Sequence, residues 1–226
     1  NSTPYENRLN ESDVFEIVSC SNVIPLKRVH YIARALDRIC ISALTDGKFK
    51  KIRWTHFGNG YVMTQLQKEV LALKNPELEV VLAGRKDRAE VLEHYKTHNI
   101  DLFINVSSSE GVPVSIMEAM SFGIPILATA VGGTPALVTS EAGMTIPPQI
   151  SSSDLRGYVE KFILMRYEER GKLSLGAYQV WKDHWDAEAN AKDWPSKEIG
   201  EQRNQHNANK VQPETCPDHL DYSYVS

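Results

Sequence analysis

The sequence has no long hydrophobic run, few cysteines and no excess of basic residues. No stretch of about 18 apolar residues occurs in the 226-residue chain, so a membrane-spanning helix is not expected. The three cysteines, Cys20, Cys40 and Cys216, are widely spaced, which favours reduced thiols in a cytoplasmic protein over a disulfide framework. The formal net charge of -4 provides no basic field for nucleic acid, so nucleic-acid binding is not expected.

Both ends of the chain are polar. Residues 1–13 lack the apolar core of a signal peptide, which also fits a cytoplasmic protein. Residues 195–226 are rich in amides and charges and have no sustained periodicity. We expect them to be disordered, because they cannot bury enough apolar surface to offset the entropy of ordering. The expected folded domain is therefore 14–194.

Short apolar runs alternate with amphipathic helical stretches, which predicts an α/β fold with a Rossmann-like, doubly wound parallel sheet. The expected strands are rich in Val, Ile and Leu, as strands covered on both faces are, and lie at 16–20, 52–57, 79–83, 101–106, 126–129 and near Met144. The expected helices lie at 29–43, 63–73, 89–98, 114–122 and 153–192, the last one broken around Gly171.

The most informative stretch is 109–135, SEGVPVSIMEAMSFGIPILATAVGGTP. An expected strand runs into a loop that holds Glu110, and Pro113 is expected at the first position of the next helix, which places Glu118 in its second turn. Ligands of open parallel sheets bind beyond the carboxyl ends of the strands. The amides at the helix start favour an anion between the two carboxylates, which should lie about 8 Å apart along the axis. This arrangement suits a nucleotide diphospho-sugar.

A second loop, 131–135, follows the next expected strand and should reach the same edge of the sheet. We expect its amides and the Thr134 hydroxyl to face phosphate or sugar. In the first loop, Gly111 lets the backbone come close to the ligand.

The stretch 110–135 resembles the donor-site signature of retaining glycosyltransferases of the GT-B fold, and looks most like family 4, the glycosyl transferases group 1 domain. The resemblance runs from about residue 15 to about residue 190 and includes IPLKR and THFGNG. It implies the C-terminal, donor-binding half of an enzyme that moves a hexose-type sugar from a nucleotide diphospho-sugar to an acceptor hydroxyl. It also implies a metal-independent reaction without a cofactor, and a missing N-terminal acceptor domain through which alone membrane association would occur.

The resemblance gives catalytic roles to Glu110, which would hold hydroxyls of the donor sugar, and to Lys27, which would bind the diphosphate and stabilise the leaving group. Glu118 would hold the ribose hydroxyls. Many relatives carry an arginine where this chain has Ser21, so hydroxyl or amide donors of Ser21 and Asn22 would replace that cation. The other residues expected to bind the nucleotide sugar are Gly111, Val112, Pro113, Val114, Ser115, Arg28, Gly84, Arg85 and Thr134.

Other functions stay open on the sequence alone. This chain could be a non-catalytic module that binds a nucleotide sugar without turning it over. A nucleotide-sugar epimerase or a glycosyl phosphorylase has the same kind of fold. An epimerase would lack the Glu110–Glu118 spacing, and a phosphorylase would need a cofactor lysine that the sequence does not place.

The histidines give weaker signals. His94 and His98 have the four-residue spacing of metal ligands on a helix, but no third ligand is evident, so no metal site is expected. His56 precedes the glycine turn FGNG, and we expect it to pack at the end of a strand.

Overall fold

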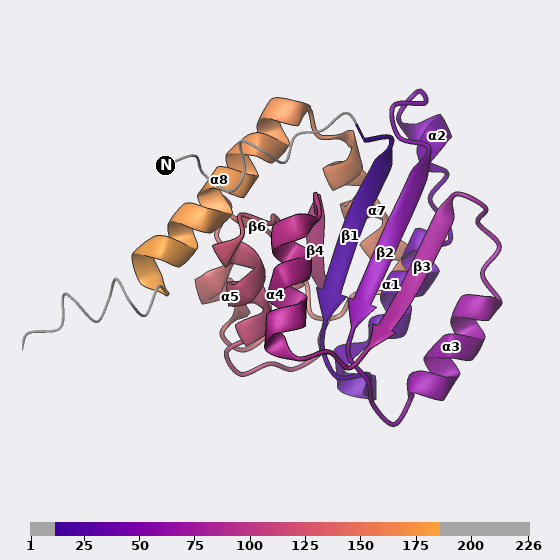
Figure 1. Cartoon of the computed structure of the whole chain (residues 1–226), viewed down its shortest axis with the longest axis horizontal. Coiled ribbons are helices and arrows are strands. Elements are labelled where there is room, and N and C mark those ends of the chain that lie inside the picture. Colours follow the sequence, from indigo (N-terminus) through magenta and orange to yellow (C-terminus); the bar gives the residue numbers. More distant parts are fainter. Residues whose placement is uncertain (1–11, 186–226) are drawn as a thin grey trace, which may run out of the picture. The chain divides into compact units, whose positions relative to one another are not determined.

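Six parallel strands of the computed structural model form one sheet, in the order β3-β2-β1-β4-β5-β6 (Figure 1). The structure describes residues 12–185. The strands are β1 (Val14–Cys20), β2 (Lys51–Phe57), β3 (Leu78–Gly84), β4 (Leu102–Asn105), β5 (Ile126–Thr129) and β6 (Gly143–Ile146). Every expected strand is present, with ends that differ by at most two residues. The predicted doubly wound α/β fold is therefore confirmed.

Helices cover both faces of the sheet (Figure 1). One apolar cluster joins the sheet to α1, α3 and α7, and the other joins it to α4, α5 and α8. Ile17 belongs to the first cluster and Val18 to the second, because successive side chains of a strand point to opposite faces. The helices are α1 (Val29–Leu36), α2 (Ile41–Leu44), α3 (Met63–Leu71), α4 (Arg88–Thr97), α5 (Val114–Ser121), α6 (Thr134–Leu137), α7 (Ser152–Leu164) and α8 (Tyr167–His184), with the 3-10 helix η1 (Pro25–Lys27) before α1.

The single helix expected at 29–43 is wrong, because the chain breaks after Leu36. Asn75 Nδ2 donates to the carbonyl oxygens of Leu36 (3.1 Å) and Ile39 (2.8 Å). The Asp37 carboxylate accepts the main-chain N–H of Asn75 (2.9 Å). A side chain from a distant loop thus takes the backbone acceptors that a continuous helix would use.

The break expected around Gly171 is also wrong, since Gly171 is buried inside α8. The chain leaves helical geometry at Met165 and Arg166 instead. Glu169 accepts the main-chain N–H of Arg166 (2.9 Å), which caps the start of α8. The predictions for 1–11 and 195–226, and the expected end of the domain at 194, lie outside the described residues.

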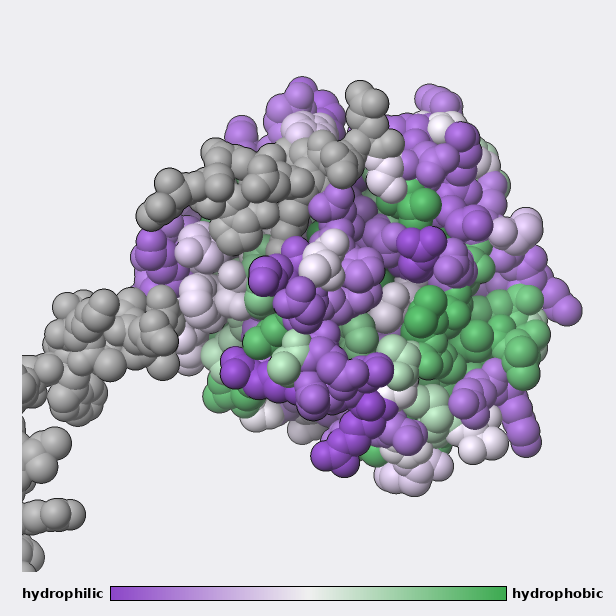
Figure 2. Space-filling view, in the orientation of Figure 1, coloured by the Kyte–Doolittle hydropathy of each residue, from purple (hydrophilic) through white to green (hydrophobic). Residues whose placement is uncertain are grey.

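An apolar area covers the edge of the sheet at β3 and α3 (Figure 2). Leu71 is 87% exposed and Val81 is 39% exposed there. This edge is two strands away from β1, so the apolar area is separate from the crevice between β1 and β4.

The winding of the sheet reverses between β1 and β4. The chain proceeds from β1 to β2 and β3 on one side, and from β4 to β5 and β6 on the other. The loops after β1 and β4 therefore separate at this point and leave a crevice, which is where open α/β sheets bind ligands.

Two glycines in the loop after β5 support the loop after β4. Gly133 N–H donates to the carbonyl oxygen of Gly111 (2.8 Å). Gly132 has a φ of 52°, and a Cβ there would lie 1.9 Å from the carbonyl oxygen of Glu110. The GGTP stretch thus holds the backbone of the loop that carries Glu110.

We predict that Gly132→Ala lowers the free energy of unfolding, because the left-handed backbone alone costs about 1–3 kcal/mol for a residue with a Cβ and the clash with a carbonyl oxygen adds to it. Gly157→Ala is the matched control, since a Cβ at Gly157 in α7 meets nothing within 4 Å. That control should gain about 0.5–1 kcal/mol of helix stability. Denaturant unfolding of both variants measures the difference, and equal stability of the two would contradict the proposed support.

Candidate functional site

A cleft of about 530 Å³ lies at the carboxyl ends of β1, β2 and β4. It occupies the crevice at which the winding reverses. Its walls include residues from the loops after β1, β3 and β4 that the sequence predicted for the nucleotide sugar, namely Ser21, Asn22, Lys27, Arg85, Glu110, Val112, Pro113, Val114 and Ser115. The fold therefore gathers most of the predicted site in one place.

An ion pair joins two walls of this cleft. Lys27 Nζ lies 2.7 Å from both carboxylate oxygens of Glu110. Lys27 ends η1, and Glu110 stands in the loop after β4. The two side chains are 21% and 9% exposed, so neither charge is well solvated. Removing one partner would leave the other charge poorly compensated.

Asn105 orients the Glu110 carboxylate, a role that the sequence analysis missed. Its Nδ2 donates to Glu110 Oε1 (3.1 Å), and its Oδ1 accepts the main-chain N–H of Ser107 (3.0 Å). Burial acts to raise the pKa of Glu110, but hydrogen bonds led by that of Lys27 outweigh it and hold this pKa below its usual value. Glu110 is thus a carboxylate at neutral pH. The one sequence signal for Asn105 is its place at the carboxyl end of a buried strand.

The start of α5 presents free N–H groups to the cleft. Pro113 is the N-cap of α5, one position before the place predicted for it. The main-chain N–H groups of Val114 and Ser115 have no hydrogen-bond partner within residues 12–185, and both residues line the cleft. Such groups at a helix start attract anions.

Glu118 lies in the second turn of α5, as predicted, but is not part of the cleft walls. Its Oε1 accepts a hydrogen bond from Arg88 Nε (2.6 Å), and its side chain is 13% exposed. Burial raises the pKa of Cys20 in the cleft wall to about 11, and the charge of Glu118 adds to this effect. Glu118 is therefore near the cleft, and Cys20 is a neutral thiol at pH 7.

Arg28 holds the loops around the cleft together through hydrogen bonds to their main chain. It has left-handed backbone geometry, with a φ of 48°. Its guanidinium donates to the carbonyl oxygens of Val106 (2.6 Å), Ser107 (2.9 Å) and Pro148 (2.8 Å). In this structure Arg28 binds protein backbone and holds η1, with Lys27 at its end, against the loop after β4.

The remaining predicted residues lie outside the cleft walls. Thr134 is only 1% exposed at the start of α6, and Gly84 and Gly111 stand beside lining residues. Their contacts with a ligand, like that of Arg28, stay predictions. The lining residues that the sequence analysis did not assign are Cys20, Phe57, Gly58, Asn59, Lys86 and Val91.

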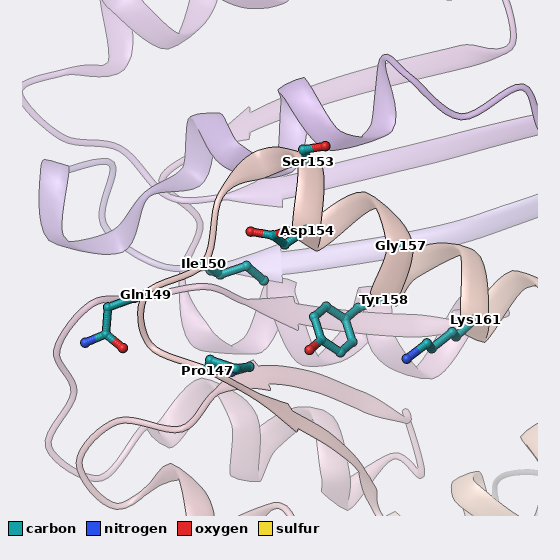
Figure 3. Close-up of a pocket in the computed structure, with 8 residues that line it drawn as sticks. All are labelled: Pro147, Gln149, Ile150, Ser153, Asp154, Gly157, Tyr158 and Lys161. Atoms are coloured by element: carbon teal, nitrogen blue, oxygen red, sulfur yellow. The ribbon is translucent and has the colours of Figure 1, made fainter.

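A second cavity, of about 400 Å³, lies between α7 and the loop after β6 (Figure 3). Asp154 there caps α7 by accepting the Ser151 N–H (3.1 Å), and Lys161 Nζ lies 4.9 Å from the ring centre of Tyr158. Gln149 and Ser153 do not converge on a common point (Figure 3). Because its charged groups already have partners, this cavity is the weaker candidate for an anionic ligand.

Neither a metal site nor a membrane span is found in the described part of the chain. Within residues 12–185, no group of three or more His, Cys, Asp and Glu side chains could hold a metal ion. His94 and His98 stack with their ring centres 3.9 Å apart. No helix in the same range is long and apolar enough to cross a membrane.

Solved glycosyltransferases share this fold. The C-terminal domain of LpcC, a glycosyl transferase group 1 family protein of Francisella tularensis, superposes with a TM-score of 0.62 at 17% identity, over 80% of this chain and 91% of that domain. HepE of Anabaena, in complex with UDP and glucose, gives a TM-score of 0.63 at 18% identity, over 83% of this chain and 49% of HepE. The chain therefore has the Rossmann-like fold of the C-terminal half of a GT-B glycosyltransferase.

Sequence comparison agrees with the fold. Amylovoran biosynthesis glycosyltransferase AmsK of Erwinia amylovora is 28% identical over 102 residues, which are 42% of this chain and 24% of AmsK. The chain thus spans about a quarter of the length of that relative. The sequence model of the family described as glycosyl transferases group 1 matches residues 4–180. With most of its length matched, this chain belongs to the glycosyl transferases group 1 family.

Proposed function

We propose that the chain is the donor-binding half of a retaining, metal-independent glycosyltransferase. The enzyme moves a hexose-type sugar from a nucleotide diphospho-sugar to an acceptor hydroxyl in glycan or polysaccharide synthesis. The observation that carries the proposal is the cleft in which Lys27, Glu110 and the free amides of α5 meet. The complex of HepE with UDP and glucose, and the amylovoran biosynthesis named for AmsK, support the same substrate class.

The diphosphate binds between Lys27 and the start of α5. Lys27 Nζ can reach either Glu110 or a phosphate oxygen, and the N–H groups of Val114 and Ser115 supply neutral donors on the other side. When Lys27 turns to the phosphate, the Glu110 carboxylate loses its cation. It then accepts hydroxyl groups of the sugar, while Asn105 continues to orient it. Donor binding thus exchanges one ion pair for two sets of ligand contacts.

Lys27 and Glu110 are the catalytic residues of this proposal. As the bond from the anomeric carbon to the diphosphate breaks, positive charge develops on the sugar ring and negative charge on the leaving diphosphate. Lys27 and the α5 amides stabilise the leaving group where its charge develops, without a metal. Glu110 holds the sugar in place beside them.

We propose that the acceptor site lies in a second domain of the enzyme. The cleft opens at the carboxyl edge of the sheet, and we assign its described walls to the sugar donor. We expect the chain by itself to bind the donor without transferring its sugar. The cytoplasmic location expected from the sequence, and any membrane association through the other domain, are part of the same proposal.

We predict that Glu110→Gln keeps or strengthens the binding of free UDP or GDP, because Lys27 is no longer held by a carboxylate. The same variant should lose the additional affinity that a sugar gives to the donor. Calorimetric titration of the whole chain with UDP, GDP, UDP-glucose and GDP-mannose measures both effects. Equal weakening of free nucleotide and nucleotide sugar would contradict the assignment of Glu110 to the sugar.

We predict that Glu118→Ala weakens nucleotide and nucleotide sugar alike, by about 1–3 kcal/mol for the ribose hydroxyls left without an acceptor. Glu160→Ala is the matched control, because Glu160 also pairs with an arginine Nε on a helix (2.7 Å), but its helix, α7, covers the other face of the sheet and contributes no residue to the cleft walls. The control should bind like the wild type. If the Glu118 variant binds the nucleotide as tightly as the control does, the ribose assignment is wrong.

A further inference from the structure

A buried chain of hydrogen bonds lies next to the cleft. Trp54 Nε1 donates to Ser19 Oγ (2.9 Å), and Ser19 Oγ lies 2.8 Å from His56 Nδ1. Trp54 and His56 are fully buried and Ser19 is 3% exposed. Ser19 and His56 face each other across the parallel pairing of β1 and β2, and the residues that follow them, Cys20 and Phe57, line the cleft. No step of the proposed function uses these three side chains or the hydrogen bonds between them.

The hydrogen bonds from Trp54 to Ser19 and from Ser19 to His56 decide which ring nitrogen of His56 carries the proton. An indole N–H can only donate, so Ser19 Oγ is the acceptor of Trp54. The Ser19 hydroxyl proton then needs its own acceptor, and among the described residues His56 Nδ1 is the one in reach. Burial lowers the pKa of His56 to about 4, so the ring is neutral at pH 7. A neutral ring that accepts at Nδ1 carries its proton on Nε2.

His56 Nε2 and the Ser21 carbonyl oxygen both lie next to Gly58. A Cβ at Gly58 would lie 1.8 Å from the Ser21 carbonyl oxygen and 3.2 Å from His56 Nε2. The Ser21 carbonyl acts on His56 in the direction that raises its pKa, although burial outweighs it. The contact falls outside ordinary hydrogen-bond geometry, and Nε2 has no other partner within residues 12–185. The Nε2–H of His56 thus attracts the Ser21 carbonyl oxygen.

The direction of that carbonyl fixes the direction of the next N–H group. No cis peptide bond occurs in the described residues, and in a trans peptide the C=O and the following N–H point opposite ways. The Ser21 carbonyl lies on the β2 side, at Gly58, so the Asn22 N–H is directed to the β4 side, into the crevice. Asn22 lines the cleft, and its N–H has no partner in the described part of the chain.

We infer that the hydrogen-bond chain from Trp54 through Ser19 to His56 positions the Ser21–Asn22 peptide so that the Asn22 N–H donates to the diphosphate of the donor. The inference rests on the proposed function and adds one hydrogen-bond donor to it, in the loop where the neutral Ser21 provides no positive charge. His56 is a positioning residue, since it acts through Ser21 and does not touch the ligand. Because buried groups hold the peptide before the ligand arrives, little ordering entropy is lost on binding.

Two substitutions at the same buried position separate positioning from a general loss of packing. His56→Asn keeps an acceptor for Ser19 at the place of Nδ1 and has no group at the place of Nε2. His56→Gln puts an amide N–H where Nε2 lies and gives up the contact with Ser19. Titrations of the whole chain followed by NMR compare UDP, GDP, ADP and dTDP with the four corresponding nucleosides.

The inference predicts that His56→Asn weakens diphosphate binding on the order of tenfold, as for a lost hydrogen bond to a charged group, with nucleoside binding unchanged. His56→Gln should keep the wild-type preference for the diphosphate. Equal losses for diphosphates and nucleosides, or the same behaviour of both variants, would overturn the inference and leave the proposed function intact. Failure of the wild-type chain to bind any nucleoside diphosphate would overturn both.

A measurement on the wild-type chain decides the matter even if a variant does not fold. The ¹⁵N shifts of the His56 ring should show the proton on Nε2, and the Asn22 amide resonance should move when a nucleoside diphosphate, but not a nucleoside, is added. A proton on Nδ1, or an Asn22 amide unmoved by bound diphosphate, would overturn the inference.

Discussion

The ion pair between Lys27 and Glu110 is the interaction on which the cleft depends. It joins the loop after β1 to the loop after β4 across the crevice at which the winding of the sheet reverses. Arg28 holds the first segment against the backbone of the second, and Gly132 supports the second from behind. The position of both charges is therefore set by contacts made outside the cleft.

The poor solvation of this ion pair also explains which ligands can bind in the cleft. Removing one partner of a fully buried ion pair costs roughly 3–5 kcal/mol, because the remaining charge is left uncompensated, and this partly buried pair carries a smaller cost of the same sign. Lys27 can separate from Glu110 only when another anion pairs with it. Glu110 can lose Lys27 only when hydroxyl or amide groups donate hydrogen bonds to its carboxylate instead. A ligand that carries a diphosphate next to a sugar satisfies both conditions, whereas a simple phosphate satisfies only the first.

Much of the fold could be predicted from the sequence, because apolar runs mark the strands, and the stretch around Glu110 was predicted together with the cleft residues that follow it. The break after Leu36 could not, since it depends on Asn75, thirty-nine residues further along. Arg28 stands beside Lys27 in the sequence, but its left-handed backbone turns the guanidinium to protein carbonyls. The network around His56 depends on the register of β1 against β2, which no local pattern specifies.

The exchange of partners at Lys27 and Glu110 can be seen in a crystal structure of this chain with a bound nucleotide diphospho-sugar, in which the distance from Lys27 Nζ to the Glu110 carboxylate is measured. We expect this distance to grow from 2.7 Å, with Nζ on a diphosphate oxygen and the Glu110 carboxylate on sugar hydroxyls. A ligand bound while the ion pair stays intact, or a ligand bound outside this cleft, would contradict it.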